Sequence, residues 1–109
     1  YTLSEMSSAR YADRTERNVI DSDGTLILVR GELEGGTALT AELAQRNGRP
    51  CLVIDLTLDP DPERIRQWLT HSRIRTLNVA GPRESRQPGI QRLACTFLQQ
   101  VLGAQAHGS

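Results

Sequence analysis

The chain has 109 residues, the size of a single domain, so we expect residues 1–109 to fold as one unit. Arginine supplies all thirteen positive charges, and thirteen Asp and Glu residues balance them. A net charge of zero excludes the global basic field that drives non-specific nucleic-acid binding, and no apolar run is long enough to span a membrane. We therefore expect a cytoplasmic protein without a nucleic-acid or membrane partner.

The first half of the chain predicts a helix, a strand, a second helix and a second strand. Ser7 or Ser8 can cap a helix through ARYADRTERNVIDSD, and the continuous apolar run Gly24–Arg30 is typical of a strand covered on both faces. A helix is expected from Thr37 to a stop at Gly48, followed by a buried strand over Pro50–Leu56.

The second half continues the alternation with a helix, a strand and a last helix. Asp61 and Pro62 are typical of the first positions of a helix, whose spacing of Ile65 and Trp68 predicts packing against a core. IRTLNVAG predicts the third strand and GIQRLACTFLQQVLG the last helix, with Leu93 among its inward residues, whereas residues 104–109 are expected to form a flexible tail. Strands that alternate with helices predict an α/β fold with a parallel sheet of three strands.

The cysteines and histidines do not indicate a protein-ligated metal. Cys51 and Cys95 lie in apolar runs without C-x-x-C spacing, so we interpret them as reduced core residues. His71 and His107 are far apart in the sequence and lack neighbouring ligands at metal-binding spacing.

Two strand-to-helix turns could hold an anion. In RGELEGGTALT, Gly35 and Gly36 permit unusual backbone angles, and Thr37 and Thr40 place hydroxyls on the first turn of a helix. In AGPRES, Gly81 allows a close approach, while Arg83, Glu84 and Ser85 offer charged and polar groups. If the sheet is parallel, both turns leave the same edge, so we expect them to face one ligand.

Plainer interpretations exist for each feature. GGT can be only a helix cap, and Glu84 can pair with Arg83 or Arg86 in a solvated loop. Asp21 and Asp23 are expected to end a helix and form a turn rather than bind a metal.

Three motifs in register carry a resemblance to a known superfamily: YADRTERNVIDSDGTLIL, GGTALTAELAQRNGRPCLVIDL and LNVAGPRESRQPGI. From Tyr11 to about Ile90 the chain resembles the SLOG superfamily of Rossmann-like, three-layer α/β/α domains, and within it the circularly permuted branch of molybdenum carriers. Members of that branch carry an earlier strand with a glycine-rich turn, S-G-G-Q-T-G-V-D, so the resemblance implies a domain that is incomplete at its N-terminus.

The resemblance implies binding of a small phosphate-bearing molecule, such as a nucleotide or a molybdopterin-type cofactor, and self-association as a homo-oligomer. A second SLOG branch, the cytokinin-activating phosphoribohydrolases, has a nucleotide-contacting arginine that matches Arg14 ahead of Ser22 and Asp23. Their catalytic glutamate position holds Thr40 here, with Glu42 two residues further on, so the resemblance implies binding more than hydrolysis.

We therefore expect a binding or carrier module. Its expected site residues are Arg14, Gly35, Gly36, Thr37, Thr40, Gly81, Arg83, Glu84 and Ser85. The alternatives are a nucleoside-monophosphate N-glycosidase and a non-catalytic interaction domain that pairs through an open sheet edge.

Overall fold

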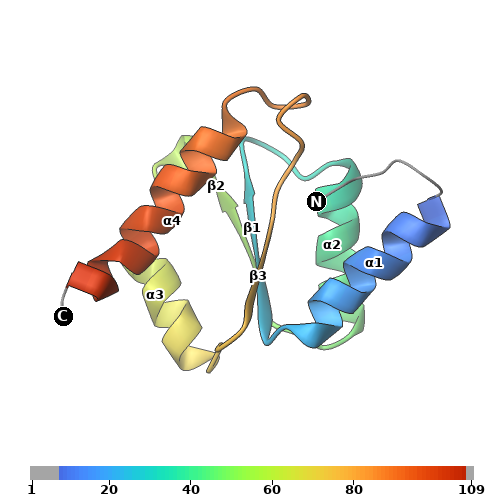
Figure 1. Cartoon of the computed structure of the whole chain (residues 1–109), viewed down its shortest axis with the longest axis horizontal. Coiled ribbons are helices and arrows are strands. Elements are labelled where there is room, and N and C mark those ends of the chain that lie inside the picture. Colours follow the sequence, from blue (N-terminus) through green and yellow to red (C-terminus); the bar gives the residue numbers. More distant parts are fainter. Residues whose placement is uncertain (1–7, 108–109) are drawn as a thin grey trace.

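The computed structural model describes residues 8–107, with side chains from Ala12 to Leu102. Helices and strands alternate in the predicted order (Figure 1). The elements are α1 (Ser8–Asp21), β1 (Gly24–Val29), α2 (Gly35–Arg46), β2 (Cys51–Asp55), the short 3-10 helix η1 (Leu56–Leu58), α3 (Pro62–His71), β3 (Leu77–Ala80) and α4 (Ile90–His107).

The three strands form one parallel sheet in the order β2-β1-β3, as the alternation of strands and helices predicted. Leu26 in the central strand pairs with Leu52 on one side and with Val79 on the other. Every residue of β1 is buried, which explains its unbroken apolar sequence.

Helices cover both faces of the sheet, so the molecule has the three layers of a Rossmann-like fold. Figure 1 shows α1 and α2 on one face and α3 and α4 on the other. On the α3 and α4 face, Leu26 and Leu28 pack with Ile65, Phe97 and Val101, and Trp68 packs against this cluster as predicted. Full burial of each such aliphatic side chain contributes roughly 1.5–3 kcal/mol to folding.

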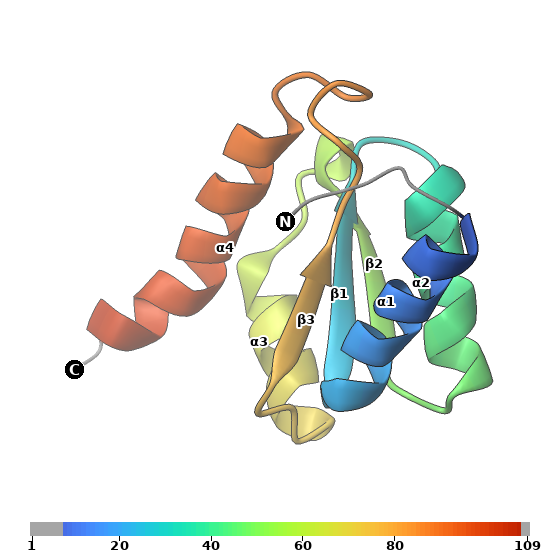
Figure 2. The same cartoon turned by 45° about the vertical axis from the view of Figure 1, so that its right-hand side comes forward.

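The last helix differs from its prediction in two respects. It continues to His107, past the Gly103 at which the apolar pattern ends, while the flexibility of residues 104–109 stays a prediction. The prediction that Leu93 faces inward is wrong, because this side chain is 42% exposed. Figure 2 shows α4 beside α3. The side chains by which α4 joins the core cluster are those of Ala94, Phe97, Leu98 and Val101, so Leu93 lies outside the face of the helix that packs.

The cysteine prediction is only partly right. Cys95 is exposed on α4 and is therefore not a core residue, whereas Cys51 is half-buried in β2. Burial raises the pKa of the Cys51 thiol, which keeps the thiol protonated and unreactive.

Asp23 forms a turn at the foot of the sheet, as predicted. Its Oδ2 atom accepts hydrogen bonds of 2.9 Å from the backbone N–H groups of Arg75 and Thr76, just before β3. The bonds from Thr76 and then Arg75 lower the pKa of the Asp23 carboxyl. This carboxylate therefore fixes where β3 starts beside β1.

Within residues 8–107, both outer edges of the sheet lack a further strand. The expectation that such an edge mediates self-association stays a prediction. No helix in the described part of the chain has the length and apolarity that crossing a bilayer requires.

Candidate functional site

A hollow of about 450 Å³ lies at the carboxyl end of the sheet, between the loop that follows β1 and the loop that follows β3. Both loops leave the sheet at its upper end in Figure 1. The hollow is lined by Glu32, Glu34, Gly35, Gly36, Thr37, Gly81, Pro82, Arg83, Arg86 and Gln87. The predicted meeting of the two turns is therefore found, because the strands are parallel.

Five of the nine expected site residues line this hollow, namely Gly35, Gly36, Thr37, Gly81 and Arg83. The other four, Arg14, Thr40, Glu84 and Ser85, are not among the lining residues. Arg14 is exposed on α1, and Thr40 is buried one turn into α2. Glu84 and Ser85 belong to the loop after β3 without lining the hollow.

The threonine hydroxyls are engaged within α2 itself. The Thr37 hydroxyl donates to the Glu34 carbonyl oxygen at 2.7 Å and accepts from the Glu34 N–H at 3.2 Å. The Thr40 hydroxyl donates to the Gly36 carbonyl oxygen at 2.8 Å. These bonds satisfy backbone groups at the start of the helix, which begins at Gly35 rather than at Thr37.

Two glycines are required by the backbone geometry around the hollow. Gly35 has a φ of +50°, a left-handed conformation that favours glycine. Gly81 approaches β1 so closely that a Cβ atom would lie 2.9 Å from the Leu28 carbonyl oxygen. The glycine predicted to allow a close approach therefore does so, although the approach is to the neighbouring strand.

The side-chain amide of Gln87 joins the two loops, a contact that the sequence analysis missed. Its Oε1 atom accepts from the Arg30 N–H at 3.1 Å, and its Nε2 atom donates to the Arg30 carbonyl oxygen at 3.2 Å. Arg30 also donates from Nη2 to the Pro88 carbonyl oxygen at 2.6 Å. Gln87 thus pairs with the end of β1 as another strand would, and nothing in the residue spacing indicates it.

The Glu84 carboxylate bonds to backbone N–H groups at the start of α4. It accepts from the Gly89 N–H at 2.5 Å and from the Gln91 N–H at 3.1 Å. These two bonds lower the pKa of the Glu84 carboxyl, Gly89 having the larger effect. These bonds give Glu84 a helix-capping role, and its pairing with Arg83 or Arg86 stays a prediction.

The Asp55 carboxylate, at the end of β2, likewise accepts hydrogen bonds from a neighbouring loop, the one after β1. Its Oδ1 atom accepts from the Gly31 N–H at 3.0 Å and from both the N–H and the hydroxyl of Thr57. The Thr57 hydroxyl and then the Gly31 amide lower the pKa of the Asp55 carboxyl. The carboxylate at the end of β2 therefore holds the turn that leads to Glu32 and Glu34.

Charges of both signs line the hollow. Arg83 and Arg86 come from the loop after β3, while Glu32 and Glu34 come from the loop after β1. One Arg86 Nη1 atom lies 3.9 Å from Glu34 Oε1, and both side chains are about 70% exposed. Of these four residues, only Arg83 was expected from the sequence. A charged loop residue that lines a site has no pattern that distinguishes it from a charged loop residue in solvent.

Comparisons with known proteins identify the family of this chain. The model of the circularly permutated YpsA SLOG family matches residues 1–102. The chain belongs to this family. A solved structure, that of "Putative molybdenum carrier protein" from Syntrophus aciditrophicus SB, is 42% identical with a TM-score of 0.79. That match covers 94% of this chain and 66% of the other, so the chain spans slightly less than two thirds of that protein. The comparison with curated proteins gave no match.

The residues expected for hydrolysis do not gather in the hollow of this SLOG domain. Thr40, which the resemblance places where the phosphoribohydrolase branch has its catalytic glutamate, is buried and bonded to Gly36. Glu42 is exposed and pairs with Arg46 at 3.1 Å on the outer side of α2. The glycosidase alternative therefore gains no support from Glu42 or from Glu84.

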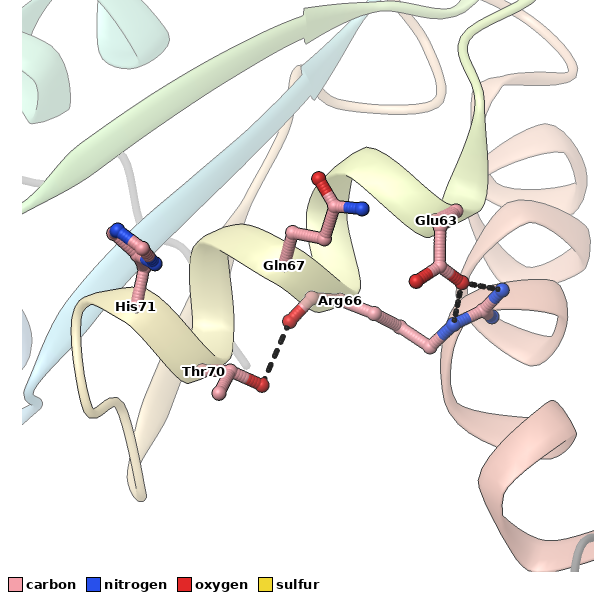
Figure 3. Close-up of a pocket in the computed structure, with 5 residues that line it drawn as sticks. All are labelled: Glu63, Arg66, Gln67, Thr70 and His71. Carbon is pink, nitrogen blue, oxygen red and sulfur yellow. Dashed lines mark hydrogen bonds and ion pairs between the residues drawn. The ribbon is translucent and has the colours of Figure 1, made fainter.

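A second hollow of about 330 Å³ lies along α3 of the SLOG domain, lined by Glu63, Arg66, Gln67, Thr70 and His71 (Figure 3). All five residues belong to this helix, so the hollow is an open surface rather than a cleft between elements. Arg66 is bound by Glu63 at 2.7 Å and donates to the carbonyl oxygens of Gln100 and Val101, which ties α3 to α4. In the described part of the chain, no three His, Cys, Asp or Glu side chains are grouped to hold a metal.

Proposed function

We propose that this domain binds a small phosphate-bearing molecule, a nucleotide or a pterin cofactor, in the hollow at the carboxyl edge of the sheet. The observation that carries the proposal is that Arg83 and Arg86 line the same hollow as the first residues of α2. A volume of about 450 Å³ lies within the common range of small-molecule sites, roughly 300–1,000 Å³.

Two kinds of group in the hollow suit a phosphate. The guanidinium groups of Arg83 and Arg86 are planar donors that can bind phosphate oxygens in pairs. Gly35 and Gly36 begin α2, where the first N–H groups have no partner within the helix and the helix dipole favours an anion. The threonine hydroxyls support this backbone, since their bonds define the first turn.

The name of the similar solved structure, "Putative molybdenum carrier protein", supports a carrier role. The residues of the hollow fit the phosphate and the polar ring of a pterin cofactor. They include no cysteine, histidine or methionine, so they offer no soft ligand to a molybdenum atom. A metal would therefore enter as part of the cofactor, whose chemistry is oxygen-atom and electron transfer, while this chain supplies the binding groups.

Equilibrium dialysis with GMP and with 6-hydroxymethylpterin phosphate tests the proposal. We expect saturable binding that weakens by about tenfold or more in Arg83→Ala and Arg86→Ala, because each loses a charge-assisted hydrogen bond to phosphate. Arg64→Ala, an exposed arginine on α3, is the matched control and should bind as the unmodified chain does. Absence of saturable binding, or unchanged affinity in both hollow variants, would overturn the proposal.

A further inference from the structure

We infer that the hollow selects ligands that carry, besides phosphate, the paired N–H edge shared by guanine and pterin, and that Glu32 is the residue that recognises this edge. The inference rests on the proposed function and specifies the ligand class of the same site. It comes from the balance of charges in the hollow, from the separation of those charges between two loops, and from the state of the two carboxylates.

The hollow is electrically balanced, which disfavours a simple anion as its ligand. Arg83 and Arg86 on one loop and Glu32 and Glu34 on the other line the same hollow, and Arg86 lies 3.9 Å from Glu34. A bare phosphate would be attracted by the arginines and repelled by the carboxylates of the same hollow, since each unit charge in a partly aqueous site interacts on the order of a few kcal/mol. A ligand with an anion at one end and hydrogen-bond donors at the other gains from both loops.

The two carboxylates differ in how far they are already engaged. Within the described part of the chain, no hydrogen bond or ion pair joins the Glu32 carboxylate to another residue. Glu34 lies 3.9 Å from Arg86 in an exposed pair, which is a weak interaction. The Glu34 side chain also belongs to the capping box of α2, in which it accepts from the Thr37 backbone. Glu32 is therefore the carboxylate that remains available to a ligand.

The donors that best match a carboxylate are two parallel N–H groups. Guanine and pterin both present a ring N–H next to an exocyclic amino group, so each can give two hydrogen bonds to the two oxygens of one carboxylate. Hypoxanthine keeps the ring N–H but has no adjacent amino group. Adenine has no ring N–H at that position, and its ring nitrogen there is an acceptor that a carboxylate repels.

Competition among four phosphate-bearing probes tests the inference: GMP, IMP, AMP and 6-hydroxymethylpterin phosphate. We expect GMP and the pterin phosphate to bind at least about fivefold more tightly than IMP, because IMP loses one of the two hydrogen bonds to the carboxylate. AMP should bind more weakly than IMP, because it loses both. In Glu32→Gln the preference for GMP over IMP should fall below about twofold. Phosphate binding itself should remain, because Arg83 and Arg86 are unchanged.

Glu42→Gln is the matched control, because Glu42 is also an exposed glutamate and does not line the hollow. It should keep the full preference. Equal binding of all four probes, or a GMP preference that survives in Glu32→Gln, would overturn this inference and leave the proposed function intact. Failure of every probe to bind would overturn both. Stronger binding of the pterin phosphate than of GMP, lost in Glu32→Gln, would support the inference with a pterin as the ligand.

Discussion

The two loops that form the hollow use their polar side chains differently. In the loop after β1 and the first turn of α2, Thr37 and Thr40 bond to backbone groups of their own helix, while Glu32 and Glu34 reach the hollow. In the loop after β3, Gln87 bonds to the end of β1, which keeps Arg83 and Arg86 beside the hollow.

The difference between short and long side chains explains this division. Short hydroxyls lie next to their own backbone, so they satisfy helix ends before they can reach a ligand. The longer side chains of Glu32, Glu34, Arg83 and Arg86 extend beyond the loop backbone and line the hollow. Glu84 is an exception, because its carboxylate reaches back to the backbone at the start of α4. Different residues of the same two loops thus contribute to stability and to ligand binding. Substitutions should therefore change one property without the other.

Gly81→Val should have the largest effect on stability and thereby test how the loop after β3 is positioned. A Cβ atom at this residue would lie 2.9 Å from the Leu28 carbonyl oxygen, and two methyl groups add to the clash. We expect a loss of about 1–3 kcal/mol in the free energy of unfolding, measured by urea denaturation. Ser85→Ala, an exposed change in the same loop, should alter stability by less than about 0.5 kcal/mol. Equal stability of the two variants would show that the close approach does not constrain the loop.

Thr37→Val tests the separation of stability from binding on the other loop. The variant keeps the shape of the side chain and removes the hydroxyl that bonds to both backbone groups of Glu34. We expect a loss of about 1 kcal/mol in the free energy of unfolding, with GMP affinity changed by less than about twofold. Thr37→Ser should restore the stability. A tenfold loss of GMP affinity at unchanged stability would instead make Thr37 a ligand, as the sequence pattern alone suggested.

The fold could be predicted from the sequence because its signals are local. The unbroken apolar run of β1 and the Asp61-Pro62 start of α3 each identify their element from a few residues. The parallel arrangement then follows from alternation, and it correctly brings Gly36 and Arg83 to one hollow. The boundary of α2 was misplaced because Glu34, a residue type uncommon at helix caps, starts it.

The site was only partly predictable because several of its contacts join distant residues. The bond between Arg30 and Gln87 spans 57 positions, and the pairing of Arg86 with Glu34 crosses between two loops. Neither has a spacing that sequence analysis could detect. The pattern also could not show that the Thr40 hydroxyl and the Glu84 carboxylate are used by neighbouring backbone groups.

Glu84→Gln should have the smallest effect, and its pH dependence identifies the cause. In the folded protein the Gly89 and Gln91 N–H groups lower the pKa of the Glu84 carboxyl, so the ionised form is the one that stabilises α4. This stabilisation is complete above the ordinary pKa range of an unfolded glutamate and is lost as the pH falls through the lower folded pKa. At pH 7 the variant should therefore be less stable than the unmodified chain. Its loss of free energy of unfolding should be smaller than that of Thr37→Val.

Urea denaturation of both chains from pH 7 into the acid range measures this difference directly. Asp23 and Asp55 also have lowered pKa values, so the unmodified chain itself loses stability on acidification. Both carboxylates are present in Glu84→Gln, so their contributions cancel in the difference between the two chains. That difference should shrink toward zero as Glu84 becomes protonated. A difference that stays constant across the acid range would mean that the amide disturbs packing at the start of α4, and that the charge of Glu84 does not hold the loop that presents Arg83 and Arg86.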